Sequence, residues 1–286
     1  SYVQALCAPP PRTLSARVVL AASGIMSQER CKCGRHAAGS VQGRSFRTCC
    51  RTCAFSKGQG HDVVCDIRAG GAAMGPPWYW QTPRTHTGAW HEEVTGRYAT
   101  DMANKLIGSG LAGCRVVRTT RVEDSGMWAR YARKRAELRS RGVSCQAVAS
   151  TSKDLRNSAN MALDSSVNEA YLFHCTTPAA AAAIVKQNFK PSTSGYFGPG
   201  VYFADDAAKS NQYARELSRD GCKVMVLCRV VLGNVVQSQQ SGLFGLLFGG
   251  QPSHGGDCLT GTTSHREFVI RDTSQIYPEY IVHYKA

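Results

Sequence analysis

The sequence predicts an α+β domain that follows a small cysteine-rich module. From Cys114 to the end of the chain, strand-length segments of alternating character are interspersed with helix-length segments. Upstream of them, six of the 13 cysteines lie between Cys31 and Cys65. A chain of 286 residues, 43% of them hydrophobic, is long enough to bury one good core and to carry a small module beside it.

The chain divides into four predicted parts. They are a lead-in, residues 1–28; a Cys/His module, residues 29–68; a linker with a helix, residues 69–110; and the main domain, residues 111–286. The lead-in has no acidic residue, two arginines and a run of three prolines. This composition is typical of a flexible segment or of a transit peptide, so the sequence leaves organellar targeting open.

Seven Cys and His side chains of the second part are spaced like zinc ligands. They are Cys31, Cys33, Cys49, Cys50, Cys53, His61 and Cys65. Thiolates and imidazoles at such intervals suit tetrahedral zinc, and this glycine-rich segment has few apolar residues with which to fold without a metal. Because one site takes four ligands, either some candidates do not bind or two ions share a bridging cysteine. The candidates include no acidic general base, so we expect a structural zinc; the alternative is a disordered segment of reactive thiols.

Cysteine usage and charge bear on the compartment and the partners. An odd number of cysteines with one dense cluster favours metal binding in a reducing compartment over a disulfide framework. We therefore expect an intracellular protein, nuclear or cytoplasmic. No apolar run approaches the ~18 residues of a membrane span, so no membrane partner is expected. The net charge of +14 attracts polyanions, which makes nucleic acid a candidate partner.

The segments without a strand pattern are predicted as linkers, loops or one upstream helix. Gly and Pro residues mark Ala69–Pro83 as a linker, in which the run Trp78-Tyr79-Trp80 could instead be an aromatic anchor. His91–Ile107 predicts a helix. Residues 153–168 are polar and predict an irregular segment or a short helix, and Val235–His265 predicts a long Gly/Ser-rich loop.

The main domain opens with a predicted strand, Cys114–Glu123, and a predicted helix, Met127–Arg141, whose many arginines indicate a solvated face. A second helix, Pro178–Gln187, follows the cap residue Thr177 and has proline at its first position. The other predicted strands are Tyr171–Thr176, Val201–Ala204, Lys223–Leu232, Glu267–Asp272 and Glu279–Lys285.

The stretch Gly195–Tyr213 predicts a glycine loop, a short strand and a helix in immediate succession. The glycines can take positive φ and let the backbone pass close to a ligand. Tyr202 lies in the strand, and the helix carries Ser210 and Tyr213 on one face. These side chains could converge on a slot for a flat aromatic ring; the alternative is that both tyrosines are ordinary core residues.

Four motifs of the main domain occur in a fixed order. They are Asn168–Thr176, Gly200–Asp205, Lys209–Tyr213 and Arg266–Ile270, and the closing strand is Gln275–Val282. Together they resemble the catalytic domain of the poly(ADP-ribose) polymerase (PARP) family, over Cys114 to Ala286. The resemblance implies the ADP-ribosyltransferase fold, in which two packed, mainly antiparallel sheets have helices at their flanks.

The resemblance also implies an activity, with NAD as substrate. Such an enzyme breaks the bond between nicotinamide and ribose and transfers ADP-ribose to a protein or nucleic-acid acceptor. The reacting ribose becomes oxocarbenium-like, so a carboxylate is needed beside it, as in glycosidases. The basic surface would suit ADP-ribose polymer as a further partner. The alternative is a catalytically inactive module of the same fold that recognises ADP-ribose or nucleic acid.

The resemblance carries three catalytic residues onto this chain: His174, Tyr202 and Glu267. Glu267 would hydrogen-bond the nicotinamide ribose, stabilise the cationic transition state and orient the acceptor. His174 would hold a hydroxyl of the adenosine ribose, with help from Thr176. Tyr202 would stack on one face of nicotinamide, opposite Tyr213.

Further NAD contacts are implied for Ser210, Tyr196 and Cys175. Ser210 would hydrogen-bond the nicotinamide carboxamide, and Tyr196 lies in the loop that would cover the dinucleotide. Cys175 departs from the family, which usually has glycine there with its backbone against the carboxamide. This backbone contact is retained if Cys175 keeps a negative φ and its thiol finds room elsewhere.

Overall fold

The computed structural model describes most of the main domain and short parts of the upstream chain. The described residues are 39–41, 44–46, 77, 79–80, 89–93, 97–108, 110–144, 149, 151, 163–238 and 256–285. Upstream, β1 (Gly39–Val41) and β2 (Arg44–Phe46) pair as a two-stranded antiparallel sheet. The predicted lead-in and all seven predicted zinc ligands lie outside the described residues.

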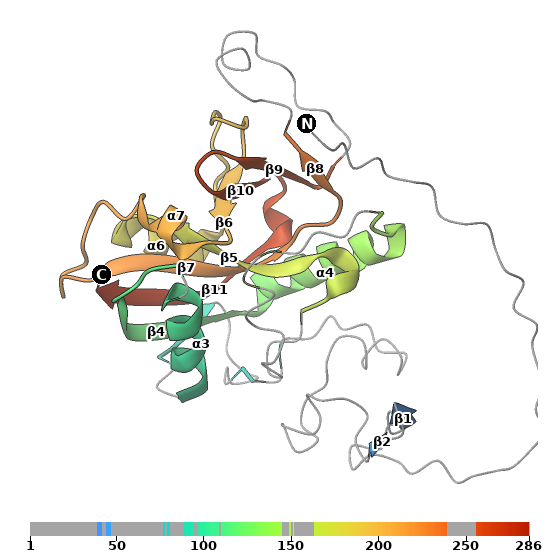
Figure 1. Ribbon diagram of the computed structural model, residues 1–286, viewed down its shortest axis with the longest axis horizontal. Coiled ribbons are helices and arrows are strands. Elements are labelled where there is room, and N and C mark those ends of the chain that lie inside the picture. The colour runs from blue at the N-terminus through green and yellow to red at the C-terminus, as the bar shows by residue number, and fades with distance from the viewer. Residues whose placement is uncertain are drawn as a thin grey trace, which may run out of the picture.

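The described part of the main domain is built on a 9-stranded sheet with the order β3-β4-β11-β7-β5-β6-β10-β9-β8 (Figure 1). The strands are β3 (Ala89–Glu93), β4 (Arg115–Asp124), β5 (Glu169–Cys175), β6 (Val201–Ala204), β7 (Lys223–Val231), β8 (Val235–Gln237), β9 (Cys258–Thr262), β10 (Arg266–Ile270) and β11 (Ile276–Lys285). Neighbouring strands are antiparallel except for β8 and β9, which are parallel. The predicted α+β class with mainly antiparallel strands is confirmed.

We expected two packed sheets, but the strands of the main domain form one continuous hydrogen-bonded sheet in the described residues. Its two halves meet between β5 and β6, where only Phe173 and Ala204 are paired. By contrast, β5 pairs with β7 along its whole length, from Glu169 to Cys175. Because a single pair constrains the angle between two strands only weakly, β6 can run steeply across the direction of β7, as Figure 1 shows. The cleft described below opens at this junction.

Four helices cover the two faces of the sheet in the described residues. They are α3 (Arg97–Gly108), α4 (Ser125–Arg141), α6 (Pro178–Gln187) and α7 (Ala207–Asn211); η2 (Ser165–Val167) and η3 (Thr273–Gln275) are short 3-10 turns. The predicted cap Thr177 forms, its hydroxyl accepting from Ala180 N at 3.2 Å, and the Asp124 carboxylate caps α4 by accepting from Met127 N at 2.8 Å. Within the described residues, no helix combines the length and the apolar character needed to cross a membrane.

Alternation along β5 distributes its side chains between two cores. Tyr171 and Phe173 face a core closed by α3 and α7, while Leu172 faces a core closed by α6. The period-2 geometry of a strand fixes this division, since successive side chains point to opposite faces. The active-site candidates of β5 are therefore held on a strand that is buried on both sides.

Two segments predicted as a helix and as a loop contain strands in the structure. The segment expected as a helix from His91 is a strand, β3, up to Glu93, and the helix α3 begins only at Arg97. Within the expected loop Val235–His265, β8 and β9 flank the residues that are not described. Both errors have one cause: these segments become strands by pairing with β4 and β10, and such tertiary pairing overrides local propensity.

Four buried charged residues pair beneath α4. The Oε1 atom of Glu169 lies 3.3 Å from Nη1 of both Arg135 and Arg229, and Arg229 Nε donates to Glu279 at 3.1 Å. Burial would raise the pKa of Glu169, but the guanidinium groups of Arg229 and Arg135 lower it to about 2. Each of these buried charges therefore has an opposite charge beside it, as buried ions require.

Tyr79 and Trp80 pack into the same region from far upstream. The Tyr79 hydroxyl donates to the Glu279 carboxylate and accepts from Arg229 Nη2 at 3.2 Å. The Trp80 ring stacks on Tyr277, with the ring centroids 5.7 Å apart. Of the two interpretations of this aromatic run, the anchor is the one that agrees with the structure. Since β3 and α3 also belong to the domain, we propose that the main domain starts at or before residue 77, upstream of the expected boundary at residue 111.

Candidate active site

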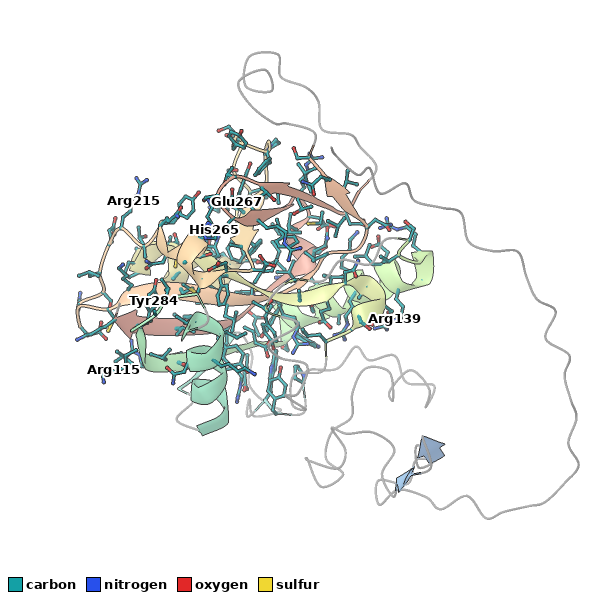
Figure 2. The ribbon with its side chains drawn as sticks, viewed as in Figure 1. Arg115, Arg139, Arg215, His265, Glu267 and Tyr284 are labelled. Atoms are coloured by element: carbon teal, nitrogen blue, oxygen red, sulfur yellow. The ribbon has the colours of Figure 1, made fainter. Side chains whose placement is uncertain are left out.

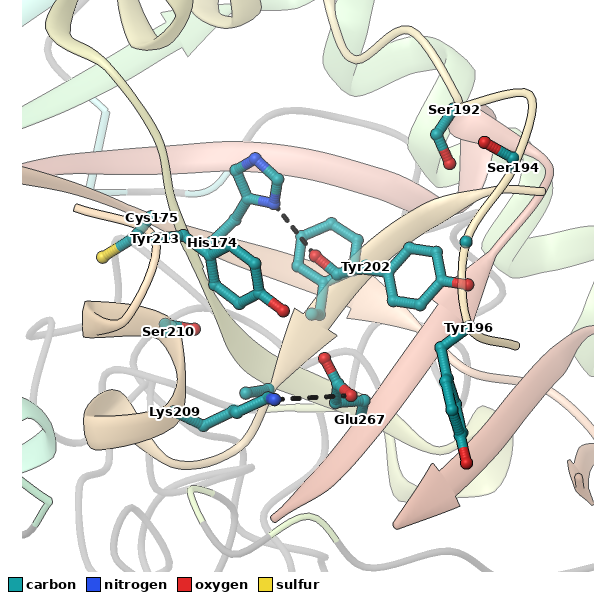
Figure 3. Close-up of a pocket in the computed structure, with 13 residues that line it drawn as sticks. His174, Cys175, Ser192, Ser194, Tyr196, Tyr202, Lys209, Ser210, Tyr213 and Glu267 are labelled. Atoms are coloured by element: carbon teal, nitrogen blue, oxygen red, sulfur yellow. Dashed lines mark hydrogen bonds and ion pairs between the residues drawn. The ribbon is translucent and has the colours of Figure 1, made fainter. Parts of the chain in front are cut away.

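A cavity of ≈ 330 Å³ lies where β5, β6, β10 and α7 meet (Figure 3). Seven of the predicted site residues line it: His174, Cys175, Tyr196, Tyr202, Ser210, Tyr213 and Glu267. A neighbouring cavity of ≈ 390 Å³ contains the eighth, Thr176, and shares His174, Ser192 and Tyr202 with the first. The structure thus brings together every predicted site residue of the main domain along one cleft. Figure 2 shows where Glu267 lies in the domain, next to the turn that carries His265.

His174 is held rigidly at the wall between the two cavities. Its Nδ1 lies 2.9 Å from the carbonyl oxygen of Tyr202, which can only accept, so Nδ1 carries the proton. The ring packs edge-on against Phe189 and tilted against Phe203, with centroids at 5.0 and 5.7 Å. Burial lowers the pKa of His174, and the hydrogen bond to Tyr202 opposes this only in part. A neutral imidazole therefore keeps Nε2 as a hydrogen-bond acceptor for a ligand.

Tyr202 joins β6 to the glycine loop that precedes it. Its hydroxyl donates to the Gly198 carbonyl at 2.7 Å and accepts from Phe197 N at 2.9 Å. The ring lies so close to Gly195 that a Cβ atom there would come within 2.3 Å of the Tyr202 hydroxyl oxygen. Gly198 takes φ +93°, which only glycine adopts readily. The close approach of the Tyr202 ring and the positive φ explain why glycine stands at positions 195 and 198. The two hydrogen bonds of Tyr202 hold the loop against one wall of the cavity.

A buried phenylalanine anchors the outer part of this loop. Phe197 is 2% exposed and lies over Gly261 of β9, where an added Cβ would come within 2.2 Å of its ring. The neighbouring Tyr196 packs edge-on against Phe197 but remains 46% exposed. The fixed anchor and the exposed ring beside it leave Tyr196 available to cover a ligand in the cavity.

The short helix α7 presents Ser210 to the cavity, and the turn that follows the helix presents Tyr213. The helix predicted to carry both side chains on one face ends at Asn211, before Tyr213. The Asp206 carboxylate caps the helix by accepting from Ala208 N at 2.7 Å. Ser210 donates its hydroxyl proton to the Phe173 carbonyl at 3.0 Å, so the lone pairs of its oxygen are left to accept from a ligand. Tyr213 is 50% exposed at the cavity wall, which gives a ligand one free aromatic face.

The Cys175 side chain turns away from the ligand space. It belongs to the core under α3, and its Sγ lies 3.4 Å from the Tyr284 hydroxyl. Burial raises the pKa of this thiol to about 12. The only non-glycine residues with positive φ in the described chain are Asn168 and Asn188, so Cys175 has an ordinary backbone. Cys175 thus has no positive φ and its thiol has room in the core, which are the two conditions for keeping the backbone contact that glycine makes in the family.

Glu267 lies at the start of β10, opposite Ala204 of β6, with its side chain at the cavity wall. It is 5% exposed, and its Oε2 lies 3.6 Å from Nζ of Lys209. Lys209 has no role in the sequence interpretation, although it directly precedes Ser210. Its position in a predicted helix, next to Ser210, could have marked Lys209 as a site residue. Its contact with Glu267 of β10, however, depends on the tertiary fold.

The predicted zinc site remains a prediction. None of its seven ligands belongs to the described residues. Among the residues that the structure does describe, no group of three or more His, Cys, Asp or Glu side chains is arranged to hold a metal ion.

Comparison with known proteins places the cleft in a family context. The family described as "Poly(ADP-ribose) polymerase catalytic domain" matches residues 100–243, which is half of the chain. The matched residues include those that β5, β6 and α7 contribute to the cleft, and they end before β10. The assignment of Glu267 therefore depends on the geometry described above.

Individual relatives agree with this match. The chain is 27% identical to "Protein mono-ADP-ribosyltransferase PARP11" of Homo sapiens over 212 residues, 64% of this chain and 54% of that protein. It is 34% identical to "Protein mono-ADP-ribosyltransferase PARP12" of Mus musculus over 125 residues, 42% of this chain and 17% of that protein. The matched region thus spans about half the length of the first relative and a smaller part of the second.

Proposed function

Because the chain belongs to the poly(ADP-ribose) polymerase catalytic domain family, we propose that it is an ADP-ribosyltransferase that uses NAD as its substrate. It cleaves the bond between nicotinamide and ribose and transfers ADP-ribose to a protein acceptor. The observation that carries this proposal is the convergence of His174, Tyr202, Ser210, Tyr213 and Glu267 on one cavity. The relatives PARP11 and PARP12 are named as protein mono-ADP-ribosyltransferases, which favours the addition of single units to protein.

Nicotinamide binds in the cavity beside α7. Its ring stacks on Tyr213 and lies against Tyr202, and such contacts contribute about 0.5–1.5 kcal/mol per pair beyond burial. Ser210 accepts a hydrogen bond from the carboxamide NH₂ group, since its own proton is committed to Phe173. The carboxamide also contacts the backbone of Cys175. Tyr196, exposed at the rim, covers the bound dinucleotide.

The adenosine end extends into the neighbouring cavity past His174. The unprotonated Nε2 of His174 accepts from a ribose hydroxyl, and Thr176 lines the same cavity. His174 and Tyr202 line both cavities, so they lie between the two halves of a dinucleotide that occupies both. This arrangement leaves the reacting nicotinamide ribose on the Glu267 side.

Glu267 acts on the reacting sugar. As nicotinamide leaves, positive charge grows on the ribose, and a buried carboxylate stabilises this charge more strongly than a solvated one would. The same carboxylate accepts from a ribose hydroxyl, because its 3.6 Å separation from Lys209 leaves its lone pairs available. It also orients the incoming acceptor at the ribose carbon.

The alternative of an inactive binding module loses its main support. The departure from glycine at Cys175 is the sequence feature that favours such a module, and this side chain packs in the core beside Tyr284. Release of nicotinamide from NAD by the purified chain tests the proposal. We expect release well above a protein-free blank; binding of NAD without release would favour the inactive module.

A pH series of NAD binding tests the role of His174. Because burial lowers the pKa of His174, the imidazole stays neutral to a pH below its ordinary value of about 6.5. NAD affinity should therefore stay constant from about pH 8 to about 6.5, and weaken only in more acid solution, where protonation removes the acceptor at Nε2. Calorimetric titration with NAD measures this. An affinity that already declines between about pH 8 and 7 would contradict the assignment of a neutral, partly buried imidazole.

Replacement of Cys175 by Gly tests which way this side chain points. Since Sγ contacts Tyr284 in the core, we expect the free energy of unfolding to fall by about 1–2 kcal/mol, from the lost side chain and the added backbone freedom. NAD affinity should change less than about 3-fold, below 1 kcal/mol. Cys175→Ala is the matched control, since it removes the thiol and keeps the backbone restricted. A tenfold loss of NAD affinity in both variants would mean that the thiol reaches the ligand.

A further inference from the structure

Lys209 places a buried ammonium group in the wall of the cavity. The residue is 7% exposed, and its Nζ lies 3.6 Å from Oε2 of Glu267 and 3.5 Å from the Thr263 hydroxyl oxygen (Figure 3). The same Nζ lies 5.7 Å from the centroid of the Tyr213 ring. A buried ammonium is unfavourable unless it is paired, and the ionic partner here is the carboxylate of the proposed catalytic residue.

The contact joins the two elements that make the cavity. Lys209, Ser210 and Tyr213 come from α7 and its end, whereas Glu267 comes from β10. A second ion pair, between Arg266 and Asp205, fastens the outer end of β10 to the residue before the α7 cap. These two ion pairs join α7 and the residues before it to β10, and they thereby set the distance between the nicotinamide side of the cavity and the Glu267 carboxylate.

The length of the Lys209–Glu267 contact preserves the function of the carboxylate. At 3.6 Å the two groups attract each other as ions but lie beyond the 2.7–3.2 Å range of an N–H···O hydrogen bond. The ammonium therefore orients the carboxylate without occupying the lone pairs that a ribose hydroxyl would use. A shorter, bonded pair would have to break before the substrate could engage Glu267.

We propose that Lys209 is a positioning residue: its ammonium holds the Glu267 carboxylate toward the cavity at a fixed distance from the nicotinamide site. This inference rests on the proposed function. Two roles of the lysine charge have opposite consequences. As a positive charge beside a developing cation, Lys209 by itself opposes the reaction, so its removal would raise turnover; as a positioning group it is needed, so its removal lowers turnover.

Four proteins separate these roles: the parent, Lys209→Met, Lys209→Arg and the control Lys186→Met. Methionine approximates the length of the lysine stem without its charge, and arginine restores the charge. Lys186 is exposed on α6 and lies outside both cavities. For Lys209→Met we expect kcat for nicotinamide release to fall about 10- to 100-fold with KM for NAD within about 3-fold, and Lys209→Arg to recover most of kcat. The control should match the parent.

Three results would overturn the proposal. The first is a Lys209→Met kcat equal to or above that of the parent. The second is a parallel loss of thermal stability and NAD affinity that Lys209→Arg does not restore, which would mean a structural role only. The third is a parent that binds NAD but releases no nicotinamide, which removes the proposed function as well. If Lys209→Met does not fold, Lys209→Gln, which keeps a hydrogen-bond donor for Thr263, replaces it in the same comparison.

Discussion

Replacement of Glu267 by Gln is expected to lower the turnover of nicotinamide release by about 10³-fold, while the affinity for NAD changes less than about 3-fold. Glutamine keeps the size and the reach of the side chain but removes the negative charge. Since Glu267 is 5% exposed, no water can replace that charge at the reacting ribose. The loss therefore falls on the transition state and not on the bound substrate, which places it in kcat.

Steady-state kinetics of nicotinamide release, together with calorimetric NAD binding, measure both parts of this expectation. Glu216→Gln is the matched control, because Glu216 is exposed and does not line the cavity. If Glu267→Gln releases nicotinamide as fast as the parent, Glu267 does not stabilise the charge on the reacting ribose, and the proposed mechanism is wrong.

Replacement of Arg229 by Met is expected to lower the free energy of unfolding by about 3–5 kcal/mol. Arg229 is the guanidinium group shared by Glu169 and Glu279, and it also donates to the Tyr171 hydroxyl at 2.8 Å. Methionine fills a similar volume, so the loss comes mainly from removing the ionic partner of the buried Glu279 and leaving Glu169 with Arg135.

Urea denaturation of the parent and the variant measures this loss. Arg219→Met, at an exposed position, is the control and should change the free energy of unfolding by less than about 0.5 kcal/mol. Should Arg229→Met not fold at all, Tyr79→Phe tests the same cluster, since it removes one hydroxyl shared by Glu279 and Arg229 and should lose about 1–2 kcal/mol. A loss below about 1 kcal/mol for Arg229→Met would mean that the buried charges are solvated or paired differently.

The residues of the cleft could be predicted because short motifs carry them. Ser210 and Tyr213 are three positions apart, and Tyr202 follows the glycine loop, so the local sequence alone brings these three residues into neighbouring elements. What joins these motifs to His174 and Glu267 is strand pairing over distances that no local pattern encodes. The resemblance to a known family supplied that link, and the structure agrees with it in placing these residues along one cleft.

The elements that could not be predicted are those whose form depends on a distant partner. His91 lies in a segment with a plausible helical pattern, yet it pairs with Val122 in the sheet. Cys258 to Thr262 is strand only because β10 lies beside it. The contact of Lys209 with Glu267 likewise joins residues that are 58 positions apart and has no sequence signature. By contrast, the direction of the Cys175 thiol agrees with simple strand alternation, which puts Cys175 on the same face as Phe173.

Covalent transfer from NAD tests the central claim most directly. The chain is incubated with NAD labelled in its adenosine part, denatured to remove bound ligand, and examined by intact-mass and gel analysis, with Glu267→Gln beside it. We predict stable label on protein, either the chain itself or an added protein acceptor, that is strongly reduced in the variant. Binding of labelled NAD to the native chain with no covalent label on any protein would contradict the assignment of this domain as an ADP-ribosyltransferase.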